Sequence, residues 1–156
     1  FQLRDEGDVE NVIISDCMIR TRQASSCWWG CGEPINIASI NRKEEIPSGK
    51  IRGVIISNVI CRGEGSIYIA GKKESPIEDL VMENIRHELI KTSKYPITGY
   101  DFRPCAGPDF EEGKISGICM RNVSGAYVRN VSVKLDPSMA PYADTPVKYE
   151  NVRMKE

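Results

Sequence analysis

Histidine is scarce in this sequence, and the residues that bind metal ions are not clustered. His87 is the single histidine, and the six cysteines include one close pair, Cys27 and Cys31. No second cysteine pair and no histidine group completes the four ligands of a structural zinc site. The sequence therefore predicts neither a metal ion nor another cofactor.

Long apolar runs and an excess of one charge are also missing. No run approaches the ~20 apolar residues with which a helix crosses a bilayer. The 21 Lys and Arg residues nearly balance the 22 Asp and Glu residues, giving a net charge of −1, and the basic residues are scattered. Since no basic stripe is interleaved with aromatic residues, nucleic acid is not an expected partner, and neither is a membrane.

Three other cysteines accompany strand-like runs. Cys17 and Cys61 lie in or beside such runs and Cys119 lies inside one, so we expect small buried or half-buried side chains there. Spacing alone assigns no disulfide. Free thiols would favour a reducing compartment, and the sequence leaves the cytoplasm, the periplasm and the exterior of a bacterial cell all open as locations.

What the sequence does contain is an internal repeat of strand-like segments. The five copies are Val9–Cys17, Ile51–Val59, Ile77–Ile85, Ile115–Val123 and Asp144–Val152. Apolar residues alternate within each copy, as at Val54 and Ile56, and this period of two is that of a strand and not of a helix. β-Branched residues, which favour strands, dominate the copies.

Each copy also carries Asn or Asp at the same position, immediately before its last residue. These residues are Asp16, Asn58, Asn84, Asn122 and Asn151. Asn and Asp tolerate the left-handed backbone conformation and bond to nearby backbone, so they are typical of a bend that ends a strand. The apolar residue that follows each of them then turns back into the core.

The five copies have the same length and pattern, but the intervals between them along the sequence are unequal. This combination favours stacked coils of fixed shape that are joined by loops of variable length. We therefore expect an all-β fold, a right-handed parallel β-helix (a solenoid) of about five rungs, in which residues 1–156 form a single domain. A β-sandwich is the alternative, but it gives no reason for an Asn or Asp bend at one fixed position.

A second strand in each rung can also be traced. We expect it at Ile67-Tyr68-Ile69 and, in the first rung, at Ile35-Asn36-Ile37. Val131 either begins the equivalent strand near the end of the chain or starts a rung of its own, because Asn130-Val131 repeats the pattern of the first strand. The second strands are expected to line a groove.

The chain begins at Phe1 without an initiator Met, and its first repeat has no polar cap. Stacked rungs normally need such a cap. We therefore expect this chain to be the C-terminal part of a longer protein. Its uncovered apolar stack end invites self-association.

Several stretches together resemble one enzyme family. They are Cys27 to Ile37 (CWWGCGEPINI), Ile51 to Val59, Gly63 to Gly71 (GEGSIYIAG), Ser75 to Leu80, and Lys94 to Pro104. These stretches are similar to glycoside hydrolase family 28, the polygalacturonase-like enzymes with a pectin lyase-like β-helix. The resemblance is strongest for gut-bacterial members of varied specificity, and it implies hydrolysis of a plant-type, uronate-containing polysaccharide or oligosaccharide.

The family's catalytic pattern is altered in this chain. Gly32-Glu33 stands where the family has Asp-Asp, Glu64 stands where it has the histidine of Gly-His-Gly, and no Arg-Ile-Lys is present. Glycosidases use one carboxyl group as a proton donor and a second carboxylate for attack or for activation of water. Glu33 and Glu64 each precede a second strand, so we expect them on neighbouring rungs as the catalytic pair. A solvated surface position is the alternative for either residue.

Further residues are expected to bind the carbohydrate. Trp28 and Trp29 lie in an insertion, where their rings can stack on a sugar face or plug a loop. Arg62, Lys94 and Arg103 are candidates to pair with a uronate carboxylate.

Two more polar residues near these candidates are assigned. Asp101 is a further candidate for carbohydrate binding, and the alternative is an ion pair with Arg103 that would hold the loop. His87 is expected to be structural or exposed.

Two other functions fit the same sequence. Loss of the family's Asp-Asp and His favours a non-catalytic β-helix that binds carbohydrate or serves in assembly. A polysaccharide lyase is the second alternative, although no Arg or Lys stands in a defined position for its base.

Overall fold

The computed structural model describes residues 1–108 and 110–155, and its regular structure is almost entirely β-strand. The strands are β1 (Gln2–Leu3), β2 (Val9–Arg20), β3 (Ile35–Ser39), β4 (Ile51–Gly63), β5 (Ile67–Ala70), β6 (Ile77–Leu89), β7 (Gly99–Asp101), β8 (Phe110–Glu112), β9 (Ile115–Leu135) and β10 (Ala143–Met154). One 3₁₀ turn, Pro137–Met139, interrupts them. Every strand pair is parallel except the hairpin β7–β8. The predicted all-β fold with a parallel sheet is thus confirmed.

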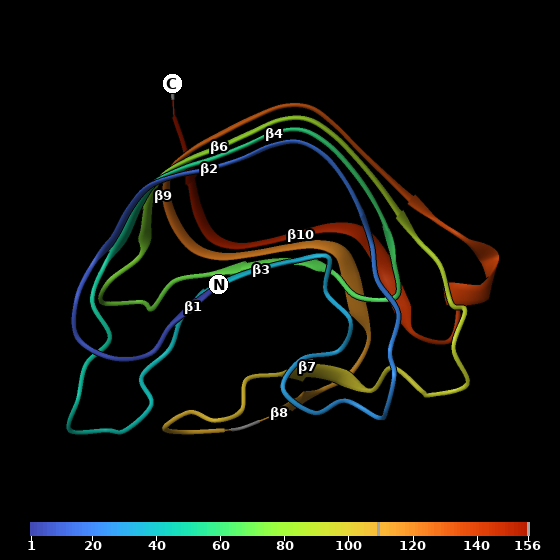
Figure 1. Ribbon diagram of the computed structural model, residues 1–156, viewed down its shortest axis with the longest axis horizontal. Helices are drawn as coiled ribbons and strands as arrows, with labels where there is room; N and C mark the ends of the chain where they lie inside the picture. The colour runs from blue at the N-terminus through green and yellow to red at the C-terminus, as the bar shows by residue number, and fades with distance from the viewer. Residues whose placement is uncertain (109, 156) are drawn as a thin grey trace.

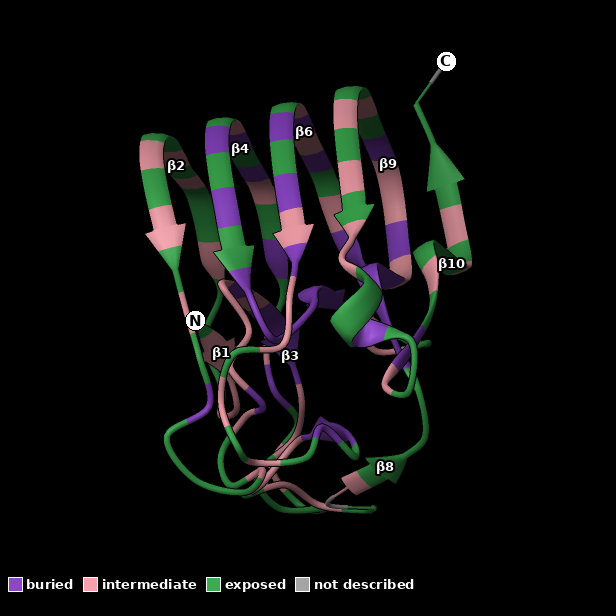
Figure 2. Cartoon of the chain, turned by 90° about the vertical axis from the view of Figure 1, so that its right-hand side faces the viewer, coloured by how far each residue is buried: buried purple, intermediate pink, exposed green. Residues whose placement is uncertain are grey.

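The strands stack in two columns, between which the chain alternates (Figure 1). Column one contains β2, β4, β6 and the second half of β9, which lie side by side in Figure 2. Column two contains β1, β3, β5, the first half of β9, and β10. Each strand therefore pairs with the strand that the chain forms on its next pass through the same column.

The Asn and Asp bends have the predicted left-handed backbone. Their φ angles are 54° at Asp16, 53° at Asn58, 55° at Asn84, 49° at Asn122 and 52° at Asn151. In column one the side chains also form a ladder. Asn58 donates to Asp16 over 3.0 Å, Asn84 donates to Asn58 over 2.9 Å, and Asn130 donates to Asn84 over 2.7 Å. Residues at one position of the repeat thus stabilise the backbone bend and join successive passes of the chain.

The alignment of the last two repeats with the first three is wrong. Ile118 pairs with Ile67 of β5, and Val147 pairs with Ile118, so both repeats belong to column two. Column one continues instead through the second half of β9, where Val131 pairs with Ile85 of β6. In both columns a left-handed Asn bend adjoins a stretch in which apolar residues alternate. The nine-residue pattern therefore does not distinguish column one from column two.

The predicted second strands are correct for the first part of the chain. Ile35 pairs with Ile67, as expected. Val131 is not their equivalent, since it lies in column one. The alternative prediction, that a first strand starts at Val131, gives the right column. The predicted start is wrong, because the part of β9 that pairs with β6 runs from Val123 to Leu135.

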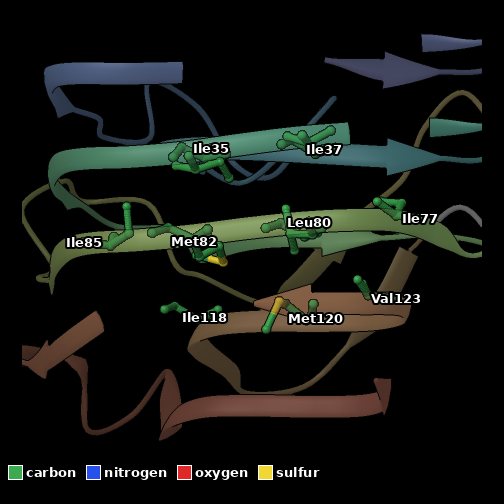
Figure 3. Close-up of a cluster of buried hydrophobic side chains, with 14 of the residues drawn as sticks. Ile35, Ile37, Ile77, Leu80, Met82, Ile85, Ile118, Met120 and Val123 are labelled. Atoms are coloured by element: carbon green, nitrogen blue, oxygen red, sulfur yellow. The ribbon is translucent and has the colours of Figure 1, made fainter. Parts of the chain in front are cut away.

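The main core lies between the two columns and is built from stacked aliphatic side chains (Figure 3). Leu80, Met82 and Ile85 of column one contact the side of column two that presents Ile37 and Ile118, and all five are fully buried. Burial of such side chains, each contributing roughly 1.5–3 kcal/mol, is the main favourable term for this fold. No helix in the described part of the chain is long and apolar enough to span a membrane.

Two of the three cysteines assigned to strand-like runs lie in the interior. Cys61 and Cys119 are buried, and Cys17 is half-buried. Burial raises the pKa of the Cys61 thiol to about 12, with a further contribution from Cys17. The expectation of small buried or half-buried side chains is confirmed.

Column one ends at β2 with incompletely covered apolar side chains. Val12, Ile14 and Ile19 pack on the core but remain half-buried, and β2 pairs with β4 alone. These are the features of an uncovered stack end. Self-association through this end stays a prediction.

Asn84→Ala is expected to lower the free energy of unfolding by about 2 kcal/mol, because alanine is strained at a φ of 55° and both ladder hydrogen bonds are lost. Asn84→Gly is the matched control, since it removes the same hydrogen bonds but relieves the backbone strain. Urea denaturation of the three proteins measures the difference. Equal stability of the alanine variant and the wild type would contradict a structural role for the ladder.

Candidate functional site

Glu64 lies between β4 and β5 and is buried, with no exposed side-chain surface. Its carboxylate accepts hydrogen bonds from Thr92 N at 2.7 Å, from Thr92 Oγ1 at 2.5 Å and from Ser93 Oγ at 2.7 Å. Ser93 N also donates to it, as does Gln23 N at 3.3 Å. The ammonium group of Lys91 lies 3.2 Å away and supplies the opposite charge. Glu64 therefore joins the segment after β6 to the segment after β2.

These contacts set the protonation state of Glu64. Burial alone would raise its pKa, but the hydrogen bonds from Thr92 and Ser93 outweigh burial and lower the pKa to about 2. The side chain is therefore ionised at neutral pH. Its burial and its hydrogen bonds give it the character of a structural anchor.

Glu33 has the opposite character. It precedes β3, is half-buried, and accepts a hydrogen bond from Cys31 N at 2.8 Å. Burial raises its pKa, backbone hydrogen bonds partly oppose this, and the nearby charge of Asp101 raises the pKa further. A raised pKa is the direction of shift that a proton donor requires.

The two predicted carboxylates belong to neighbouring passes of the chain, as expected. A side chain at Gly65 would collide with the backbone N of Glu33 at 2.5 Å, so the segments carrying Glu33 and Glu64 are in direct contact. Their carboxyl groups nevertheless have different surroundings, and the charge that acts on Glu33 is that of Asp101. The structure therefore associates Glu33 with Asp101 instead of with Glu64.

Asp101 and Arg103 form the ion pair that the sequence suggested. Arg103 Nε lies 2.9 Å from Asp101 Oδ1, and Arg103 Nη2 lies 2.6 Å from Oδ2. Burial would raise the pKa of the fully buried Asp101 side chain, but the hydrogen bonds and charge of Arg103 lower it. Arg103 also donates to Cys27 O over 2.9 Å. The end of β7 is thereby fastened to the insertion that carries Cys27.

The tryptophans of this insertion are exposed, Trp28 to 62% and Trp29 to 69%. The guanidinium of Arg103 lies over the Trp28 ring at 4.4 Å from its centroid, a cation–π contact that holds one face of the ring. A disulfide joins Cys27 to Cys31 and closes the insertion. Neither ring plugs the loop.

A pocket of about 330 Å³ lies at this insertion. Its lining includes Trp28, Trp29, Glu33, Arg22 and Gln23. Gln23 is 5% exposed, and its Oε1 atom has no hydrogen-bond donor among the described residues. The pocket therefore combines two exposed rings with a carboxyl group whose pKa is raised, and exposed aromatic rings are the groups on which a sugar ring stacks.

Two other predicted binding residues lie outside this pocket. Arg62, at the end of β4, forms an ion pair with Glu88 at 2.6 Å. Lys94 lies 5.4 Å from the ring centroid of its neighbour Tyr95. Neither basic residue lines the pocket that contains Glu33.

His87 is structural. It is 2% exposed, and its Nε2 atom lies 3.2 Å from Gly65 O. Burial lowers the pKa of His87, and the hydrogen bonds with backbone only partly oppose this.

Sequence reasoning missed Arg22 and Gln23. They follow β2 after one intervening residue, Thr21, and fit neither the repeat nor the family resemblance. A polar pair between the end of a strand and an aromatic insertion was the only available signal, and it is a weak one.

The expected groove along the second strands is partly filled. Tyr100 of β7 packs on Tyr68 of β5 with ring centroids 5.0 Å apart, and Phe102 packs on the same ring at 5.7 Å. A hollow of about 380 Å³ remains beside them, with Lys72 and Arg121 in its lining. Lys72 donates to Asn41 and Ser48, and Arg121 is paired with Glu111 and Glu150.

In the described part of the chain, no group of three His, Cys, Asp or Glu side chains is placed to hold a metal ion. Comparisons of the chain with protein-family models, with curated proteins and with solved structures each find no match.

Proposed function

We propose that the chain is part of a right-handed parallel β-helix of the polygalacturonase-like family 28, and that it hydrolyses a uronate-containing glycan. Alternation of the chain between two columns of parallel strands supports the fold, since a solenoid winds in this way. The sequence stretches quoted above support the family.

The observation that carries the function is the state of Glu33. A carboxyl group whose pKa is raised by burial lies in a pocket with two exposed tryptophans. In the proposed reaction a sugar stacks on Trp28 or Trp29, and Glu33 donates its proton to the departing glycosidic oxygen. A water molecule supplies the hydroxyl that bonds to the anomeric carbon, and its remaining proton restores the Glu33 carboxyl. Asp101 stays ionised and its negative charge helps to keep the proton on Glu33.

Binding without turnover is the second candidate. A glycosidase needs a second carboxylate that reaches water or the sugar. Both other carboxylates in the neighbourhood, Glu64 and Asp101, have fully buried side chains that are occupied by hydrogen bonds. This burial favours a carbohydrate-binding β-helix in which the pocket holds the glycan intact.

One experiment separates these functions. The protein is incubated with oligogalacturonides and with neutral plant oligosaccharides, while new reducing ends are assayed and binding is followed by calorimetry. New reducing ends support hydrolysis, binding without product supports the second candidate, and an unsaturated product indicates a lyase. The absence of both binding and product across the panel contradicts the proposal.

A further inference from the structure

A second, smaller pocket with a strongly basic lining adjoins the pocket of Glu33. It has a volume of about 300 Å³. Its lining consists of Arg20, Thr21, Arg22, Arg62, Ile90 and Thr92. Three guanidinium groups thus surround one hollow whose lining contains no carboxylate.

The three arginines are poorly neutralised. No salt bridge among the described residues involves Arg20 or Arg22. Arg62 pairs with Glu88 through Nε only, at 2.6 Å, and Glu88 is shared with Lys134 at 2.9 Å. The charge of Asp136 also acts on Arg62 and Lys134, so Arg20, Arg22, Arg62 and Lys134 are accompanied by two carboxylates, those of Glu88 and Asp136.

Strand register places two of these cations directly beside each other. Arg20 of β2 is the register partner of Arg62 of β4, and strands in a sheet lie about 4.8 Å apart. Like charges in opposing positions destabilise a sheet. An anion bound between the two side chains would remove this repulsion, and so the arrangement itself indicates a ligand.

The nearest buried anion does not neutralise the pocket. Glu64 lies behind Thr92, which donates to it, and Lys91 pairs with it at 3.2 Å. Its negative charge is already balanced there. The field that an incoming ligand meets is therefore that of the arginines.

The basic pocket and the pocket of Glu33 share a lining residue. Arg22 lines both. Thr21 Oγ1 donates to Gly32 O over 2.7 Å, which fixes the arginine-bearing segment against the residue that precedes Glu33. A chain of sugars that occupies one pocket can therefore reach the other.

We propose that Arg20, Arg22 and Arg62 form a subsite for the anionic group of a sugar, a carboxylate or a sulfate. The sugar is the neighbour of the unit held at Trp28 and Glu33, so this proposal rests on the proposed function and names the class of its substrate. The planar fork of arginine suits two-point binding of either anion.

Calorimetry with three trisaccharides tests the subsite: an oligogalacturonide, a sulfated trisaccharide and a neutral one. Arg20→Gln is expected to weaken binding of the anionic ligand by about tenfold and to leave the neutral ligand unaffected, because Arg20 lines the basic pocket and not the pocket of Glu33. Arg22→Gln is expected to weaken binding of the anionic ligand by about the same factor. Binding of the anionic ligand is also expected to weaken as salt increases. The anionic ligand that loses affinity in the variants identifies the group, carboxylate or sulfate.

Arg129→Gln is the matched control, since Arg129 is an exposed arginine of β9 that pairs with Glu83 away from the pocket. It should bind every ligand as the wild type does. Anionic glycan binding that is unchanged in Arg20→Gln and Arg22→Gln would overturn the subsite while the proposed function stands. Titration with inorganic sulfate tests the anion site without a glycan. Sulfate binding that depends on the arginines, together with no glycan binding, supports the anion site and contradicts the proposed function.

Discussion

Replacing Glu64 by alanine is expected to lower the free energy of unfolding by about 3–5 kcal/mol. The substitution removes a fully buried carboxylate and leaves Lys91, which is also largely buried, without its opposite charge. The N–H groups of Thr92 and Ser93 lose their acceptor at the same time. The loss of stability comes mainly from these unpaired groups, since buried hydrogen-bond donors and charges without a partner are costly.

The same carboxylate predicts how stability depends on pH. Because the pKa of Glu64 falls from 4.5 in the unfolded chain to about 2 in the folded one, its contribution is complete above pH 4.5 and is lost as the pH falls through about 2. The contribution amounts to roughly 3 kcal/mol. Glu64→Gln, which has no charge to lose, should show a flatter acid limb than the wild type.

Denaturant unfolding between pH 2 and pH 7 measures both effects. Glu83→Ala is the matched control, because Glu83 is a glutamate on the outer face of β6 whose partner, Arg129, is exposed. Its loss should cost at most about 1 kcal/mol, as is usual for surface pairs. Equal costs for Glu64→Ala and Glu83→Ala would show that Glu64 is not an anchor.

Local features of this fold were predictable because they depend on neighbouring residues alone. Alternating apolar residues such as Val54 and Ile56 give strands, and Asn84 gives a left-handed bend, whatever the rest of the chain does. The column to which a strand belongs is not predictable in this way, since it depends on which other strand, distant in the sequence, pairs with it. The bends at Asn122 and Asn84 have the same sequence pattern but different columns, so pattern alone could not separate them.

The candidate site was predictable only in part for a similar reason. Glu33 lies two residues before β3 and Glu64 three residues before β5, and the sequence therefore suggested that the two form a catalytic pair on neighbouring rungs. What separates them is contact with distant segments. Thr92 and Ser93 reach Glu64, whereas Asp101 acts on Glu33, and nothing within either local motif encodes these partners.

Glu33→Gln is expected to lower turnover of the oligogalacturonide about 10²–10⁴-fold while binding is retained, if the glycan is hydrolysed as proposed. Glutamine has nearly the same shape and can keep the hydrogen bond from Cys31 N, but it has no proton to donate to the leaving oxygen. Calorimetry and a reducing-end assay on the same samples separate the loss of turnover from any loss of affinity. Glu6→Gln, which changes an exposed glutamate outside the pocket, is the control and should behave as the wild type does.

The pH profile supplies a second readout of the same residue. Since burial and the charge of Asp101 raise the pKa of Glu33, the protonated form that donates persists to higher pH than for an exposed glutamate. Activity of the wild type should therefore fall as pH rises through the pKa of Glu33, and the residual activity of Glu33→Gln should lack this alkaline limb. Turnover that survives the substitution with the limb unchanged would assign the proton donor to another group. Binding that survives without turnover in either protein would instead leave Trp28 and Trp29 as a glycan-binding surface.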